Sequence, residues 1–377
     1  MSPRPSRVAG ETPTANACSP GDLAWSMLRA IMKTIIRSLA SLLLLSLLPV
    51  VASAQPVRPL GRVDAIDASS FNIEWPMSGF EARFDGSKLT AVIEDTGKNW
   101  LNVEVDGKVQ AIALKEGRFT YTLYSGLEGL HTANVTRRTG AQEGPTTFVS
   151  VSARNLRPTQ TPERQILVIG DSIASGYGVE GENQWCHFTQ ATQNAGLAWP
   201  ALLAKTFGAD MQLLAVDGRG LYRNFEGDAP TMATLMERVV PSEETLWGGR
   251  YAADVIIVNL GTNDFAAGDA GPRFKDAYVA MLGRLRAAHP RASIIATLGG
   301  MLERPKLVMA RTAVESVVAV RNMAGDTRTS FVFLDPPATG RRFGCDWHPG
   351  KDAQSYMAQT LQVAVTKALG WKATGAK

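Results

Sequence analysis

The chain has few of the residues from which metal and redox centres are built. Its 377 residues include only 3 cysteines and 4 histidines, with no His-x-x-x-His pair and no cysteine pair at zinc spacing. Charge of one sign is not in excess either: 39 Lys and Arg face 35 Asp and Glu, and no basic stripe with interleaved aromatic residues appears. The composition therefore argues against a metal, a cofactor and a nucleic-acid partner.

A long apolar run is found near the N-terminus, and its surroundings are those of an export signal. Lys33 and Arg37 precede the apolar stretch 39–51, and Ala52-Ser53-Ala54 offers small residues for cleavage. The stretch is too short to span a bilayer. We interpret residues 1–54 as an upstream stretch and a signal peptide, with translation from Met32, cleavage after Ala54, export to the periplasm or beyond, and no membrane span afterwards. A genuine segment before Met32 is the alternative.

Two segments with different hydrophobic patterns follow. Residues 55–153 alternate apolar and polar side chains in short runs, with turn signals at Asp85-Gly86 and Asp106-Gly107, which is typical of a small β-sandwich or jelly roll. Residues 154–163 contain two prolines and are predicted to be a linker. In residues 164–377, continuous apolar runs alternate with helical patterns, which predicts a three-layer α/β/α domain around a parallel sheet. Strands are predicted over 166–169, 213–216, 255–260, 293–298 and 331–334, and helices over 272–289, 306–323 and 352–369.

The most informative motif joins a predicted strand to a serine. Gly170-Asp171-Ser172 directly follows the strand 166–169, so the hydroxyl lies at the carboxyl end of a parallel strand, where open α/β sheets place their binding sites. Taken alone, this is ordinary turn composition, and serine is also a favoured helix cap. Three further segments change the interpretation: Asp217-Gly218-Arg219-Gly220, Gly261-Thr262-Asn263-Asp264 and Gly344-Cys345-Asp346-Trp347-His348-Pro349.

Together these segments provide the groups that acyl transfer requires. Ser172 is predicted to be the nucleophile and His348 its base, because a serine hydroxyl is hardly ionised near neutral pH. The backbone N–H groups of Ser172 and Gly218 and the side-chain amide of Asn263 are predicted to form the oxyanion hole. Asp346 is expected to bind the imidazole Nδ1 and complete a triad. A main-chain carbonyl in that position, which would give a dyad, is the alternative.

Other residues near these segments have weaker assignments. Trp347, Tyr222, Arg219 and Asn224 are candidates for substrate contacts, with ordinary packing as the alternative. Asp171 and Asp264 are expected to bind backbone amides of their own turns.

Cys186 and Cys345 form an even pair in a chain predicted to be exported. A disulfide between them is expected, and two free buried thiols are the alternative. The disulfide would tie the loop after the serine strand to the loop of His348.

The four blocks resemble the SGNH, or GDSL-like, esterases and lipases, which have a flavodoxin-like α/β/α fold and use the motif residues in these roles. The usual last block is Asp-x-x-His, whereas Cys345 stands three residues before His348 here, which puts the triad in doubt. A narrower set of elements is similar to carbohydrate esterase family two: Trp75-Pro76, Phe84-Asp85-Gly86, Val105-Asp106-Gly107, Gly218-Arg219-Gly220-Leu221 and Cys345-Asp346-Trp347-His348-Pro349.

Members of that family pair a jelly roll with the hydrolase domain, remove acetyl groups from xylan and related polysaccharides, and also use the dyad. The resemblance implies a serine esterase that acts on acetylated polysaccharide or oligosaccharide through an acetyl-enzyme. A GDSL lipase or thioesterase is one alternative. A carbohydrate-binding protein with a vestigial hydrolase domain is another.

Overall fold

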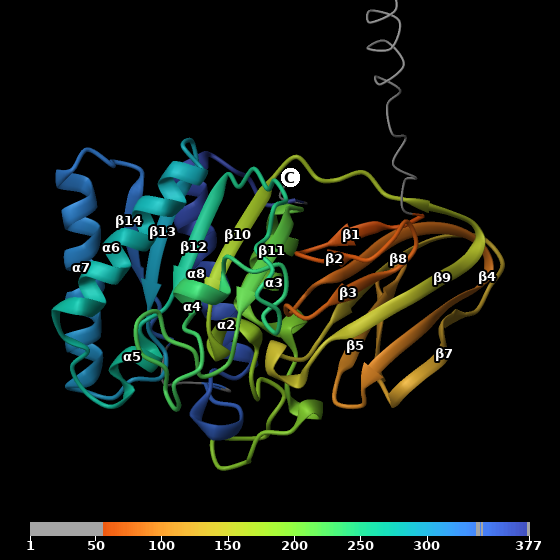
Figure 1. Cartoon of the computed structure of the whole chain (residues 1–377), viewed down its shortest axis with the longest axis horizontal. Coiled ribbons are helices and arrows are strands. Elements are labelled where there is room, and N and C mark those ends of the chain that lie inside the picture. Colours follow the sequence, from red (N-terminus) through yellow and green to blue (C-terminus); the bar gives the residue numbers. More distant parts are fainter. Residues whose placement is uncertain (1–55, 337–339, 341, 375–377) are drawn as a thin grey trace, which may run out of the picture. The chain divides into compact units, whose positions relative to one another are not determined.

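Two β-sheets of different topology organise the part of the chain that the computed structural model describes, residues 56–336, 340 and 342–374 (Figure 1). Within these residues, one sheet has nine strands with antiparallel pairing and the other has five parallel strands. The predicted start at Met32 and the signal peptide lie outside the described residues.

The antiparallel sheet is built along one long strand, β4. Its first half pairs with β8 and its second half with β7, and the change of partner occurs near Gly86, whose φ is +107°. The predicted turn at Asp85-Gly86 is therefore wrong, because the chain changes partners there without reversing. Asp106-Gly107 is the hairpin turn between β5 and β6, and both residues have the positive φ that such a turn requires.

The strands of this domain are β1 (Arg58–Leu60), β2 (Asp64–Ala65), β3 (Phe71–Ile73), β4 (Gly79–Thr96), β5 (Trp100–Val105), β6 (Lys108–Ala113), β7 (Glu116–Ser125), β8 (Leu130–Arg137) and β9 (Thr146–Pro158), with the short 3-10 helix η1 (Ala141–Glu143) before β9. Strand β9 includes residues 154–158, which the composition predicts to be linker. The two prolines of the predicted linker do not interrupt this strand, because Pro158 is its last residue and Pro162 follows its end.

The parallel sheet has the strand order β11-β10-β12-β13-β14. This is the flavodoxin-like order 2-1-3-4-5, in which ligands bind where the winding reverses, between the first and third strands. Ser172 directly follows β10, the first of these strands, and so lies at that reversal. The predicted α/β/α fold with an N-terminal β domain is confirmed.

The elements of this domain are β10 (Gln165–Gly170), α2 (Ser172–Ser175), η2 (Gln190–Thr192), η3 (Ala195–Leu197), α3 (Trp199–Phe207), β11 (Asp210–Ala215), α4 (Met232–Leu235), β12 (Val255–Asn259), α5 (Thr262–Ala266), α6 (Gly271–Ala288), β13 (Ser293–Leu298), α7 (Lys306–Met323), β14 (Thr329–Phe333), η4 (Cys345–Trp347) and α8 (Lys351–Leu369). The predicted helices and strands agree with these bounds to within three residues.

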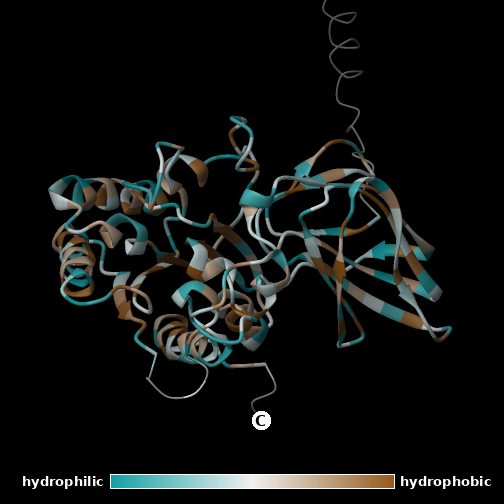
Figure 2. Cartoon of the chain, turned by 90° about the horizontal axis from the view of Figure 1, so that it is seen from below, coloured by the Kyte–Doolittle hydropathy of each residue, from teal (hydrophilic) through white to brown (hydrophobic). Residues whose placement is uncertain are grey.

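Helices cover both faces of the parallel sheet. Apolar side chains of α6 and α7 pack on one face, and those of α3 and α8 pack on the other. The strands are accordingly hydrophobic along their length, whereas hydrophobic and hydrophilic residues alternate along strands of the β domain (Figure 2). Burial on two faces explains why this sheet was readily predicted from continuous apolar runs.

The two domains contact each other through both apolar and polar groups, and Trp75 is part of the hydrolase core. The Arg58 guanidinium lies 2.7 Å from both Glu81 and Asp210, and the Trp75 indole N–H donates to the Val239 carbonyl at 2.9 Å. Glu74 accepts from the backbone and the hydroxyl of Ser242. These ion pairs and hydrogen bonds hold the β domain against the hydrolase domain.

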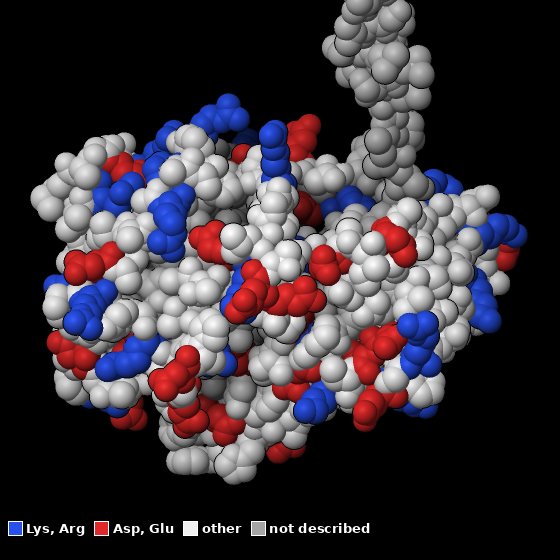
Figure 3. All heavy atoms as spheres, in the orientation of Figure 1, with Lys and Arg blue, Asp and Glu red and all other residues white. Residues whose placement is uncertain are grey.

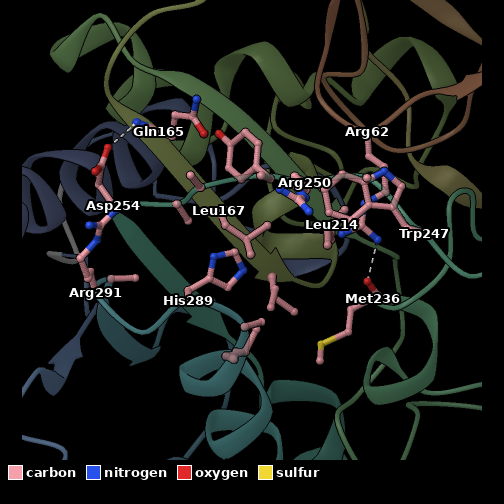
Figure 4. A pocket seen from close by; sticks show the side chains of 18 of the residues that line it. Arg62, Gln165, Leu167, Leu214, Met236, Trp247, Arg250, Asp254, His289 and Arg291 are labelled. Atoms are coloured by element: carbon pink, nitrogen blue, oxygen red, sulfur yellow. Dashed lines mark hydrogen bonds between the residues drawn. The ribbon is translucent and has the colours of Figure 1, made fainter. Parts of the chain in front are cut away.

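A cavity of about 890 Å³ lies at a further contact between the domains, made by Arg62 (Figure 4). The Arg62 guanidinium lies over the Trp247 ring, 4.2 Å from its centroid, and Nη1 donates to the carbonyls of Met236 and Arg238 at 2.7 Å. Residues that precede strands, such as Asp254, line the other end. Arg62 thus connects the β domain to the long segment between β11 and β12, away from Ser172.

The described surface has charges of both signs. On the face seen in Figure 3, Lys and Arg are interspersed with Asp and Glu, and no extended area of one sign is visible among the described residues. None of the helices in the described ranges combines the length and apolar character that a bilayer span requires.

Candidate active site

Ser172 is held by a short strand-to-helix turn. Asp171 caps α2, because its carboxylate accepts from the Ile173 N–H at 3.0 Å. Gly170 permits the turn, since a Cβ at this position would lie 2.6 Å from that of Ala174. The Ser172 side chain is almost buried, and its Oγ lies 2.8 Å from His348 Nε2. The two residues are thus in hydrogen-bond contact across 176 positions of sequence.

The hydrogen bonds of His348 define its tautomer. Nδ1 lies 3.1 Å from the main-chain oxygen of Asp346. A carbonyl only accepts, so Nδ1 carries the proton and Nε2 presents its lone pair to the Ser172 hydroxyl. Burial lowers the pKa of His348 to about 4. The imidazole is therefore neutral, as a base must be, down to mildly acidic pH.

The Asp346 carboxylate does not bind the imidazole, so the expected triad does not agree with this geometry. It accepts from the Tyr177 hydroxyl at 3.1 Å and the Phe188 N–H at 2.8 Å, and it lies 3.2 Å from His187 Nδ1. Burial raises its pKa, but these hydrogen bonds outweigh burial and lower it overall. Asp346 has a φ of +50°, which turns its carbonyl toward His348 and its side chain toward the neighbouring loop. The arrangement is that of the dyad.

The three predicted oxyanion-hole groups lie around the same space. Gly218 has the left-handed φ of +73°, a Cβ there would meet no atom within 4 Å, and the residue lines one pocket with Ser172 and Asn263. The Asn263 amide donates to the Arg219 carbonyl at 3.0 Å and, over a longer distance, to the Asp171 carboxylate at 3.3 Å. Stabilising negative charge on an oxygen bound beside Ser172 requires the second N–H to leave Asp171 for that oxygen, while the first keeps the amide in place.

The two buried aspartates have different partners. Asp171 bonds within its own turn, as expected, and burial raises its pKa to about 7, with a further contribution from Asp217 and Asp264. Asp264 bonds mainly to another loop, and its own backbone N–H is a lesser partner. It accepts from the backbone N–H groups of Leu221, Tyr222 and Arg223 at 2.7 to 2.9 Å. The carboxylate after Asn263 thus shapes the loop that contains Gly218.

A pocket of about 940 Å³ opens in front of Ser172 and His348. Trp347 lines it and is 44% exposed, so this predicted contact residue is available to a ligand. Within the described residues, the pocket wall does not include Tyr222, Arg219 or Asn224. Asn224 is buried and bonds to Gly220 N and Ala229 O inside its own loop, and Arg219 contributes its carbonyl to Asn263. Those three expected substrate contacts are not supported.

The predicted disulfide is confirmed. Cys186 and Cys345 are bonded, and the main chain beside them is paired as well: Asp346 N–H donates to the Cys186 carbonyl and Cys345 N–H to that of Gly178, both at 3.0 Å. The loop after the serine strand and the loop of His348 therefore form one braced unit.

Aromatic residues at the site were missed by sequence reasoning. The Tyr177 ring lies 4.1 Å from the His348 ring between centroids, Trp185 packs edge-on against Trp347, and Phe225 and Phe343 line the pocket. Tyr177 stands between two glycines with positive φ, Gly176 and Gly178. The sequence pattern that could have indicated this contact is an aromatic residue between two glycines, Gly176 and Gly178, shortly after Ser172.

Comparison with known proteins agrees with this architecture. A family model described as the GDSL-like Lipase/Acylhydrolase family matches residues 168–355, and one described as Carbohydrate esterase 2 N-terminal matches residues 60–162. The solved structure of a family two carbohydrate esterase from Clostridium thermocellum in complex with cellohexaose is 31% identical, with a TM-score of 0.80, and the match covers 84% of this chain and 99% of that one.

Curated proteins extend the likeness. An acetylxylan esterase / glucomannan deacetylase of Cellvibrio japonicus is 28% identical over 354 residues, 86% of this chain and 94% of that protein. The cellulase/esterase CelE of Acetivibrio thermocellus is 31% identical over 319 residues, and this chain spans 39% of the length of CelE. With both family segments and 99% of a solved relative matched, the chain belongs to carbohydrate esterase family two and is a carbohydrate esterase, a carboxylic ester hydrolase.

Proposed function

We propose that this chain is an exported O-acetyl esterase that deacetylates xylan-like polysaccharide through an acetyl-enzyme on Ser172. The observation that carries the proposal is the 2.8 Å contact between Ser172 Oγ and the Nε2 of a neutral His348, at the wall of an open pocket. The names of the Cellvibrio japonicus relatives support the substrate class, and the sequence pattern of residues 32–54 supports export.

In the first half-reaction, Ser172 Oγ bonds to the acetyl carbonyl carbon while its proton passes to His348 Nε2. The carbonyl oxygen becomes negative and accepts from the N–H groups of Ser172 and Gly218 and from the Asn263 amide. The bond to the sugar oxygen then breaks, and that oxygen takes the proton from Nε2. Asp346 acts through its carbonyl, which keeps Nδ1 protonated and the ring oriented.

In the second half-reaction, water is the nucleophile. It loses a proton to His348 Nε2 as it adds to the acetyl-enzyme, and the same donors stabilise the second oxyanion. The bond to Ser172 Oγ breaks, the hydroxyl recovers its proton from Nε2, and acetate leaves.

A lipase or thioesterase would need a long apolar channel for its acyl chain. The pocket wall instead has both aromatic and charged side chains, among them Glu303, Arg304 and Arg342. Rates on acetyl and octanoyl nitrophenyl esters distinguish these functions. We expect the acetyl ester to be preferred by at least about tenfold, and a preference for octanoyl would overturn the acetyl assignment.

Acetate release from acetylated xylan, mannan and peptidoglycan tests the substrate. We expect the wild-type protein to release acetate from xylan or mannan and Ser172→Ala to release none. If Ser172→Ala kept the full biological activity, the protein would act as a carbohydrate-binding protein instead.

A further inference from the structure

Gln193 lies between the β domain and the loop that contains Gly218, outside the four sequence blocks. Its side chain is completely buried. On the β-domain side, its Oε1 accepts from Gly140 N–H at 2.8 Å, and its main-chain oxygen accepts from Arg138 Nε at 2.8 Å. Two groups of the β domain therefore fix both the backbone and the side chain of this residue.

On the other side, the amide of Gln193 reaches the two catalytic segments. Its Nε2 donates to the Asp217 carboxylate at 3.0 Å and to Ser175 Oγ at 3.1 Å. Ser175 is the last residue of α2, the helix that begins at Ser172, and its hydroxyl also donates to Asp217. One buried amide thus binds both the nucleophile helix and the residue before Gly218.

The position of Asp217 explains why this matters for catalysis. The peptide unit between Asp217 and Gly218 contains the Gly218 N–H, so anchoring the Asp217 side chain restrains the plane in which that donor lies. A third anchor comes from the β domain, because Gln142 Nε2 donates to the same carboxylate. Gly140 approaches so closely that a Cβ there would lie 2.9 Å from Asp217 Oδ2.

We propose that Gln193 is a positioning residue through which the β domain holds the Gly218 oxyanion donor in register with Ser172. The proposal rests on the proposed function, in which Gly218 N–H stabilises the oxyanion. It gives the β domain a part in catalysis that does not depend on its binding glycan. Gln193 does not line the pocket, so its effect should appear in turnover and not in substrate binding.

The test is steady-state kinetics on nitrophenyl acetate and acetylated xylan with Gln193→Met, which keeps the size of the side chain and removes its hydrogen bonds. We expect kcat to fall about thirtyfold, because the side chain loses its three hydrogen bonds to Gly140, Ser175 and Asp217, with KM unchanged within twofold. Because a buried change can impair folding, Gln142→Ala is the second variant. It removes one exposed anchor and should lower kcat about fivefold.

Two measurements separate positioning from general stability. Ser242→Ala removes a hydrogen bond between the domains that shares no partner with Asp217, and it should leave kcat within twofold. Phenylboronic acid, which forms a tetrahedral anion on an active serine, should bind Gln193→Met more weakly in proportion to the loss of kcat.

Folded Gln193→Met and Gln142→Ala proteins with kcat within twofold of wild type would overturn the inference, as would an equal loss in Ser242→Ala. If the wild-type protein itself releases no acetate, the proposed function fails, which is a different result.

Discussion

The serine and the histidine of the candidate site are held in position by different means. Ser172 sits between a buried strand and a capped helix, so regular secondary structure positions it. His348 follows the short η4, where Asp346 and Trp347 both have left-handed φ values, and it depends on the disulfide, the Tyr177 ring and the carboxylate of Asp346.

The difference shows that local sequence pattern determines the position of Ser172, whereas contacts between distant segments determine the position of His348. Non-glycine residues with positive φ persist only where their surroundings over-determine them. The geometry of His348 should therefore respond to changes in contacting residues more strongly than the strand-to-helix turn of Ser172 does.

The largest effect is expected on the serine side. Ser172→Ala removes the nucleophile and should lower kcat at least about ten-thousandfold, while the strand-to-helix turn keeps the fold. Acetate release and circular dichroism measure the two consequences. Residual turnover within a hundredfold of wild type would remove Ser172 from the mechanism.

Asn263→Ala tests the oxyanion donor at the end of the neighbouring strand. Loss of one such donor lowers turnover about a hundredfold to a thousandfold, and the variant should fold because Asn263 supports no secondary structure beyond its own short helix. Single-turnover rates on an acetyl ester measure the effect. Normal rates in a folded variant would mean that the amide does not contact the transition state.

Removing the disulfide tests the histidine side. A Cys186→Ala/Cys345→Ala variant should lose about 2–4 kcal/mol of unfolding free energy, and its kcat should fall as well, because the loop of His348 is less restrained. Denaturant unfolding and kinetics on the same preparation report both. Unchanged kcat with reduced stability would show that the other contacts suffice to position the imidazole.

Asp346→Asn distinguishes the dyad from the triad at the same loop. Asparagine tolerates left-handed φ and keeps an acceptor for Phe188 N–H, and the carbonyl that binds His348 is unchanged. We expect kcat to fall less than tenfold. A loss of about ten-thousandfold, as for the acid of a triad, would show that the carboxylate binds Nδ1 during turnover.

The smallest effect is expected from pH. His348 acts as a base only when neutral, and burial lowers its pKa to about 4. The acetyl-ester kcat/KM should therefore stay level between about pH 5.5 and 8 and decline as pH falls through about 4, where the imidazole gains a proton. A midpoint near 6.5 would indicate a solvent-exposed histidine in the free enzyme.

The sequence was sufficient for the parts of the molecule that depend on local pattern. The strand over 293–298 was predicted with the bounds found, because burial on a parallel sheet leaves a continuous apolar run. The helix over 306–323 was predicted with the bounds found from its helical pattern, in which buried residues such as Ala310, Val314 and Val317 recur every three or four positions. Ser172, Gly218 and Asn263 were placed together because parallel strands bring their carboxyl ends to one edge.

The remaining features depend on contacts between distant segments, which the spacing of residues in the sequence does not reveal. Asp346 stands two residues before His348 in either conformation, and only its left-handed φ decides whether its carbonyl or its carboxylate meets the imidazole. Asn224 lies in a loop that closes on itself, and Gln193 belongs to no motif. Their partners come from other segments, so local composition could not indicate their roles.

Trapping the acyl intermediate shows whether Ser172 is the nucleophile. The protein is mixed with nitrophenyl acetate, quenched in acid within the first turnovers, digested and examined by mass spectrometry. We expect an acetyl group on the peptide that contains Ser172, and none on that peptide in Ser172→Ala. Acetate release at full rate with no acetyl group on Ser172, or with the acetyl group on another residue, would contradict the account.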